Sequence, residues 1–447
     1  MDGAKWRSKY TLKEIIPNNK AVFYRIFESL KYRDFKLYFW GQCISLIGSW
    51  IQTIAMSWLV YRLSGSIVLL GTVVFLIQIP MLVVTPFTSV LIDRYNKRNL
   101  LLLTQALAMV QALALALLVF TDTVQIWHIL ALSLFNGCYS ALDMPARQAF
   151  YTTLVPHQNL SNAVALNSSI MNGSRLIGPA IGGFFIHLFG EAGCFLINAI
   201  SFLFVLGALY KIKTVHQTHD PSSKMNIWGD LKAGYLYVKQ SLPIKALLFT
   251  LSGFSFCVYP ATVFLAAYVK DTLHSDSTVL GYLMSGAGIG AFISTMYLAA
   301  RKSILGIGKV LVLSSLLGAL SLIPLFFIQH VWAALIVIAF LGFGITCSVA
   351  AINTLLQALS DQNMRGRIMG YYSMAFIGLS AVGALFWSWL ADFISLALTM
   401  AIAGSISILF SLWFEKHRPV VRQHARPIYI KKGIIKEIAE GLEAAEG

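Results

Sequence analysis

The chain is 447 residues long, with 57% hydrophobic and only 12% charged residues and a mean hydropathy of +0.71. Soluble chains carry about a quarter charged residues, so a soluble globular protein is excluded. The net charge of +15 does not indicate a nucleic-acid partner, because the basic residues are concentrated in the segments between apolar runs.

Apolar runs of about 18 to 25 residues recur along the chain, each long enough to cross a hydrocarbon layer about 30 Å thick. We therefore predict an all-α membrane protein with twelve transmembrane helices. The first six cover 37–61, 68–92, 100–120, 126–150, 160–189 and 192–210. The second six cover 245–269, 279–300, 310–328, 331–357, 368–390 and 395–414.

The lysines and arginines support this number of spans, because such residues concentrate on the cytoplasmic side of a membrane. Nearly all of them fall on the side that holds both termini. The exceptions are Arg62 and Lys270 on the other side and Arg175 within the fifth span. The segment before the first span is polar and basic, unlike a secretory signal, so we expect both termini in the cytoplasm.

The longest connection between spans divides them six and six, and the two halves echo each other. Gln158-Asn159 and Gln362-Asn363 each precede a new span. Such a duplication predicts two pseudo-symmetric six-helix bundles with a site between them near the membrane midplane. The predicted division is a cytoplasmic N-terminal segment 1–36, bundles 37–213 and 243–414, a cytoplasmic central loop 214–242 and a cytoplasmic tail 415–447.

An acid followed by three bases stands after the second span, in the string SVLIDRYNKR from Ser89 to Arg98. Taken alone, these charges would favour a role in topology. The string resembles motif A of the major facilitator superfamily, although Ser89 and Asn96 stand where the family usually has glycine. The resemblance implies a cytoplasmic gate made by Asp93, Arg94, Lys97 and Arg98 with Arg365 and Arg367 at the start of the eleventh span.

Small residues on one face of the fifth span predict close packing with a neighbouring helix. Ser174, Gly178 and Gly182 are spaced four residues apart, which forms a small-xxx-small surface. Gly178 and Gly182 also belong, with Pro179 and Gly183, to the string GPAIGG, which resembles the antiporter motif of exporting branches of the superfamily.

Longer strings are more specific. Asp143-Met-Pro-Ala-Arg147-Gln148, NAVALN at 162–167 and Arg365-Gly-Arg367 resemble the drug:proton antiporter-3 branch, which includes macrolide efflux proteins and the enterobactin exporter. The resemblance implies a monomeric secondary transporter of the bacterial inner membrane. It would export an amphipathic small molecule by alternating access, in antiport with protons.

Spans 1, 4, 7 and 10 each contain polar residues at helical spacing, and these are the four spans that line the cavity in the superfamily. Polar groups facing lipid would lack partners, so these stripes should face a cavity or another helix, and both alternatives stay open. The cavity candidates are Gln42, Ser49, Gln52, Gln78, Asn136, Ser140, Arg175, Tyr259, Asn353 and Gln357.

Three charges fall inside the predicted spans. Asp143 and Arg147 are four residues apart on one helix face, where they could pair. The carboxylate could carry a coupling proton, or the two could be a structural ion pair, and Pro145 between them could disturb it. Arg175 has no carboxylate in its own span, so it should meet Asp143, a carbonyl array or an anionic substrate.

The sequence contains few motifs that would indicate other functions. The chain has no phosphate-binding loop, zinc-protease or serine-hydrolase motif, so we predict no enzyme, cofactor or metal site. The alternatives are siderophore uptake or lysophospholipid flipping by the same fold, and a non-transporting membrane receptor or scaffold. A scaffold would tolerate loss of all the polar stripes.

Overall fold

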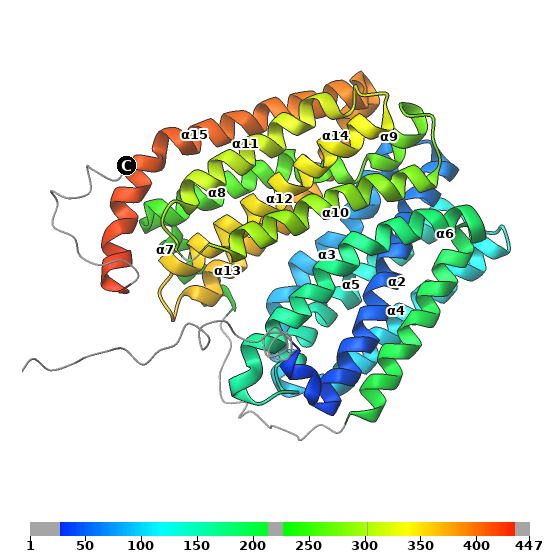
Figure 1. The fold of residues 1–447 in the computed structure, drawn as a ribbon, viewed down its shortest axis with the longest axis horizontal. Helices are drawn as coiled ribbons and strands as arrows, with labels where there is room; N and C mark the ends of the chain where they lie inside the picture. Colours follow the sequence, from blue (N-terminus) through cyan, green and yellow to red (C-terminus); the bar gives the residue numbers. More distant parts are fainter. Residues whose placement is uncertain (1–26, 213–226, 302, 434–447) are drawn as a thin grey trace, which may run out of the picture.

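The computed structural model describes residues 27–212, 227–301 and 303–433, with all side chains except those at 85–94, 227–228 and 230–231. Every element of this part is a helix (Figure 1). The first group is η2 Glu28–Lys31, α2 Arg33–Ser64, α3 Ile67–Arg94, α4 Lys97–Phe120, α5 Ile126–Tyr151, η3 His157–Asn159 and α6 Leu160–Lys211.

The second group follows α7 Ile227–Gln240, a helix outside the spans, within the predicted central loop. Its members are α8 Leu242–Cys257, η4 Tyr259–Thr262, α9 Leu265–Asp271, α10 Ser277–Ala299, α11 Ile307–Leu325, α12 Val331–Leu359, α13 Arg365–Ser373, the π-helical η5 Met374–Gly378, α14 Leu379–Ile394 and α15 Leu396–Lys431.

Within the described residues, ten helical stretches are long and apolar enough to cross a membrane. One of them includes α6, which changes direction at Gly190, where φ is 68° and ψ is −179°, a conformation essentially confined to glycine. This stretch therefore provides two crossings. The 26-residue α5 lies outside the ten, since its polar and charged residues lower its hydropathy, yet it packs among them. With these two additions the fold is consistent with the predicted twelve spans.

The helices pack as two groups, which meet along two seams. Helices α2 to α6 pack on one another, and α8 to α15 do the same (Figure 1). Between the groups, α6 runs beside α10, and α3 runs beside α14. In the predicted numbering these pairs are spans 5 and 8 and spans 2 and 11, which hold equivalent places in the two predicted halves.

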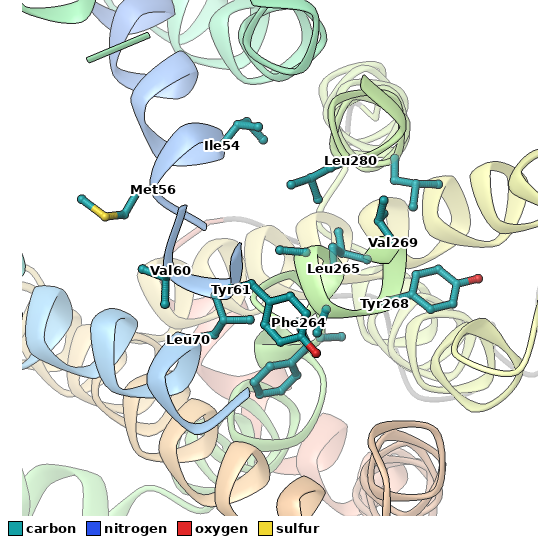
Figure 2. Close-up of a cluster of buried hydrophobic side chains, with 14 of the residues drawn as sticks. Ile54, Met56, Val60, Tyr61, Leu70, Phe264, Leu265, Tyr268, Val269 and Leu280 are labelled. Carbon is teal, nitrogen blue, oxygen red and sulfur yellow. The ribbon is translucent and has the colours of Figure 1, made fainter. Parts of the chain in front are cut away.

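Three hydrophobic cores show how the groups are joined. One core takes side chains from both groups, such as Leu70 of α3 and Leu280 of α10, at the end of the molecule far from the termini. Figure 2 shows Tyr61 of α2 within it, beside Phe264 and Leu265 of the other group. The other two cores each belong to one group and lie nearer the termini. We call these the joined end and the termini end.

Two predicted spans differ from the structure. The seventh was expected as one helix over 245–269, but it is divided into α8, η4 and α9. Pro260 lies at this break, and a proline has no backbone N–H to continue a helix. The twelfth was expected to end at Phe414, but α15 continues to Lys431, because Phe414, Val421 and Ala425 pack into the core of the second group.

At the termini end, α7 and the residue after α15 form hydrogen bonds with the connection between α12 and α13. The Lys432 Nζ atom donates to the carbonyl oxygens of Ala358 at 3.0 Å and Ser360 at 2.6 Å. Burial lowers the pKa of Lys432, and the nearby Asp361 carboxylate opposes that shift. From α7, the Tyr237 hydroxyl donates to the Asp361 carboxylate at 3.1 Å. Both α7 and the end of α15 are thereby tied to the second group.

Candidate functional site

The glycines of the fifth span form the first seam. A Cβ atom at Gly183 would lie 2.5 Å from the Ser277 carbonyl oxygen and 2.9 Å from the Gly281 Cα atom. A Cβ atom at Gly281 would lie 2.7 Å from the Pro179 carbonyl oxygen. The backbones of α6 and α10 therefore touch across the two groups at a point that only glycine allows.

The other small residues of this motif pack within the first group. A Cβ atom at Gly178 would lie 2.5 Å from the Cβ atom of Trp50, and one at Gly182 would lie 3.1 Å from the Cα atom of Ile51. Ser174 is buried on the same face. The predicted close approach is thus to α2, while Pro179 and Gly183 contact α10.

The second seam contains one of the predicted cavity residues. Gln78 of α3 accepts a hydrogen bond from the Ser380 hydroxyl of α14 at 2.7 Å. Nearby, a Cβ atom at Gly378 would lie 2.9 Å from the Leu82 side chain. Gln78 therefore bridges the groups in this conformation.

Polar contacts add to the closure at the joined end. The Tyr61 hydroxyl of α2 donates to the carboxylate of Asp271, at the end of α9. The Lys270 ammonium lies 5.5 Å from the centre of the Tyr61 ring. His187 of α6 lies 3.8 Å from the carboxylate of Asp276, which caps α10. Each of these contacts joins the two groups and would have to break for this end to open.

Asp143 lies in a buried polar cluster inside the first group. Its side chain forms an ion pair with Arg147, one turn along α5, so Pro145 does not prevent the pairing. The other carboxylate oxygen accepts hydrogen bonds from Thr104 Oγ1 at 2.8 Å and Gln105 Nε2 at 2.6 Å, both on α4. Asp143 is only 7% exposed, and the Nε atom of Arg147 has no partner within the described part of the chain.

Gln52 and Gln42 are buried within the first group rather than at an open surface. Gln52 Nε2 donates to Gln111 Oε1 at 2.9 Å, and Gln52 Oε1 accepts from Asn198 Nδ2 at 2.7 Å. Gln42 is 1% exposed. For Gln52, hydrogen bonding between helices is the alternative that the geometry favours.

Replacing Gln52 with leucine is expected to lower the stability of the first group by about 2 kcal/mol, because Gln111 and Asn198 would each lose a buried partner. Thermal unfolding of purified protein in detergent measures the loss. Thr53→Val is the control, since Thr53 is exposed and its hydroxyl donates to the Ser49 carbonyl oxygen within α2; its effect should stay within about 0.5 kcal/mol. Equal losses in both variants would show that the Gln52 bonds contribute nothing.

Arg175 of α6 is half-buried. Its guanidinium carbon is 6.0 Å from the centre of the Trp50 ring, a cation–π contact. No carboxylate of the described residues lies within ion-pair distance of it. Asn172, three residues earlier, is only half-buried. Arg175 does not meet Asp143, which pairs with Arg147 instead.

The remaining cavity candidates bond mainly within their own helices. Ser140 donates to Asn136 at 2.9 Å, and Gln357 donates to Asn353 at 2.5 Å. Gln357 is exposed, and the other three are half-buried. Ser49 donates to the Ser45 carbonyl in α2 at 2.9 Å, and the Tyr259 ring packs edge-on against Phe376 with 5.2 Å between ring centres.

Part of the predicted gate is described. Asn96 caps α4 by accepting the Arg98 backbone N–H at 2.9 Å, which explains a residue other than glycine here. The Arg98 side chain donates to the carbonyl oxygens of Leu209 at 2.6 Å and Tyr210 at 2.7 Å, at the end of α6. Lys97 is half-buried, and Arg365 and Arg367 begin α13. The side chains of Asp93 and Arg94 lie outside the described residues.

Several residues of these sites were not predicted. No sequence pattern indicated a role for Thr104 and Gln105, since isolated polar residues in an apolar span do not show which helix they face. Trp50 could be predicted only as part of an apolar span. Tyr61 and Asp271 stand 210 positions apart, and nothing in either string links them. The described residues hold no cluster of three metal-ligating side chains.

Comparison with known proteins gives a consistent assignment. A family model described as "Transmembrane secretion effector" matches residues 26–426. The staphyloferrin A transporter of Staphylococcus aureus is 25% identical over 85% of this chain and 95% of its own length. The enterobactin exporter EntS of Shigella flexneri is 24% identical, over 78% of this chain and 83% of its own length.

Solved structures show the same fold at low sequence identity. A crystal structure of the nucleoside transporter NupG has a TM-score of 0.66 at 14% identity, over 88% of this chain and 99% of that one. A POT family transporter has a TM-score of 0.64 at 15% identity, over 87% of this chain and 96% of that one.

Proposed function

The chain belongs to the transmembrane secretion effector family of the major facilitator superfamily, and from this membership we propose that it exports an amphipathic small molecule across a bacterial inner membrane. The termini end then faces the cytoplasm, as the positive-inside rule predicts. The cargo is a siderophore or a drug-like compound. The names of relatives support this class, since one is a staphyloferrin A transporter, one an enterobactin exporter and one a multidrug efflux pump homologue of Lactococcus lactis.

The observation that carries this function is the shared core at the joined end, together with the separate cores at the termini end. In a transporter with two bundles that rock about a central site, such an arrangement corresponds to an inward-facing state. The moving halves are 37–213 and 243–414, connected by 214–242. Outward opening would separate α6 from α10 and α3 from α14, while Asp93, Arg94, Lys97 and Arg98 close against Arg365 and Arg367.

The cargo binds between the halves, nearer the termini end than the seams are. Arg175 and Trp50 offer a cation beside an aromatic surface, and Arg175 has no carboxylate partner among the described residues. An anionic group on the cargo would satisfy this charge. Asn136, Ser140, Tyr259, Asn353 and Gln357 supply the polar contacts from the other cavity helices.

Protons drive the export through Asp143. Its carboxylate is buried and contacts three donors, the side chains of Thr104, Gln105 and Arg147. Asp143 takes up and releases the coupling proton as the two groups rock.

Inside-out vesicles that carry the protein test this function. With an acidic lumen they should accumulate ethidium or metal-free enterobactin, and an ionophore that collapses the proton gradient should release the accumulated compound. Vesicles that accumulate neither compound would contradict export. Accumulation that survives collapse of the gradient would contradict proton antiport and leave export standing.

The same assay separates the alternatives of uptake, flipping and scaffold. If the protein performs uptake, right-side-out vesicles should accumulate the siderophore and inside-out vesicles should not. If it flips lysophospholipid, a labelled lysophospholipid should move between the leaflets, and neither ethidium nor enterobactin should accumulate. A receptor or scaffold would move none of the three.

A further inference from the structure

A basic pocket at the start of the first span lies outside every site described above. Its volume is about 580 Å³, and it is lined by Leu30, Lys31, Arg33, Lys36, Leu37 and Trp40. The three cations are exposed, and the Trp40 side chain is 53% exposed. Among the described residues, Arg33 and Lys36 have no carboxylate within ion-pair distance, while Lys31 lies 3.9 Å from Glu28.

Four of the six pocket residues share one face of α2, and Leu30 and Lys31 come from η2 just before it. Arg33, Lys36, Leu37 and Trp40 recur at helical spacing, and Ile44, 39% exposed, continues the same face one turn further. The opposite face carries Phe35, Tyr38 and Phe39, which are buried in the core of the first group. The pocket face is therefore turned away from the protein, toward the lipid that surrounds the first span.

The order of residues along this face matches the layers of a membrane surface. The cations stand at the first turn, where water and headgroups meet the helix. Trp40 follows about 10 Å deeper, at 1.5 Å per residue, which is the interfacial depth that tryptophan prefers. Ile44 then lies at the depth of the acyl chains. The first-turn N–H groups of α2 have no side-chain cap and add to the positive potential, which Asp34 in the same turn partly offsets.

We propose that this pocket binds the phosphate headgroup of an anionic phospholipid, with Arg33 and Lys36 on the phosphate and Trp40 and Leu37 along the upper acyl chain. A soluble phosphate would use only the cations and leave the apolar half of the pocket without a role. An acidic peptide is disfavoured because the face continues into hydrocarbon at Ile44. The lipid would hold the start of α2, the helix that carries Tyr61 at its other end, at a fixed depth.

Native mass spectrometry of the purified, delipidated protein tests the site with phosphatidylglycerol and phosphatidylcholine of matched acyl chains. The wild-type protein should retain phosphatidylglycerol in preference to phosphatidylcholine. Each basic residue near an anionic headgroup contributes about fivefold in affinity, so Arg33→Gln with Lys36→Gln should reduce this preference by about 30-fold. The matched control is Lys416→Gln with Arg422→Gln on the exposed face of α15, which removes the same charge and should keep the preference.

Three results would overturn the proposal. The first is a wild type that binds the two lipids equally. The second is a pocket variant that keeps the wild-type preference or loses no more of it than the control does. The third is displacement of the lipid by millimolar glycerol 3-phosphate, which would show a site for soluble anions. Unchanged thermal unfolding of the pocket variant excludes misfolding as the cause of a lost preference, and transport is not part of the readout.

Discussion

Gly183→Leu is expected to abolish transport while both helix groups stay folded. The added side chain would enter the space held by the Ser277 carbonyl and by Gly281 of α10, so the two groups could not meet at the joined end. Overpacking costs about 1–3 kcal/mol, and here the cost falls on the closed joined end alone. A penalty of that size shifts the balance between conformations by about 5- to 150-fold.

Cysteine accessibility gives a direct measurement of this shift. A cysteine at Ser277, which is buried at the seam, should be labelled from the outside in Gly183→Leu and protected when Gly183 is kept. Gly173→Leu is the matched control, because it lies on the same helix and a Cβ atom there meets no heavy atom within 4 Å. If Gly173→Leu and Gly183→Leu impaired transport equally, close contact at the seam would not be the cause.

Asp143→Asn is expected to remove proton-coupled transport and also to lower stability. Arg147 would lose its carboxylate partner, and breaking a buried ion pair on one side costs about 3–5 kcal/mol. Thermal unfolding in detergent measures the loss of stability. Accumulation in inside-out vesicles, with and without a proton gradient, measures the coupling.

A double variant separates the two roles of Asp143. Asp143→Asn with Arg147→Gln removes both charges, so most of the lost stability should return while coupling stays absent. Recovery of gradient-driven accumulation along with stability would show that the pair is structural and that the proton is carried elsewhere. Arg147→Gln alone tests the arginine, since it leaves a buried carboxylate with only the Thr104 and Gln105 donors.

The polar residues show why the site was harder to predict than the fold. The spacing of Gln42 and Gln52 correctly placed both away from lipid, but a cavity and a neighbouring helix satisfy that requirement equally. Only the position of α4 and of Asn198 showed that Gln52 bonds inside the group. Gln78, which was predicted as a cavity residue, lies instead at the seam with Ser380. Which partner a polar side chain meets depends on helix rotation and crossing, which local spacing does not contain.

The positions of the helix breaks were also hard to predict, because they too depend on neighbouring helices. Pro260 was visible in the sequence, yet prolines also occur inside α5, α6 and α15, where the helix continues. Whether a proline ends a helix in a membrane depends on what can bond the freed carbonyl, which is a property of the neighbours.

Hydropathy and motifs were enough to identify an all-helical membrane protein of this superfamily, and they marked the glycines of the fifth span and the Asp143–Arg147 pair. These features are local, because hydropathy, charge and four-residue spacing act within one helix. The contacts of Gly183 with Gly281 and of Tyr61 with Asp271, and the joining of the groups at one end and not the other, became visible in the folded molecule. Such contacts join residues far apart in the chain, and two bundles that share only part of their cores can pack in more than one way.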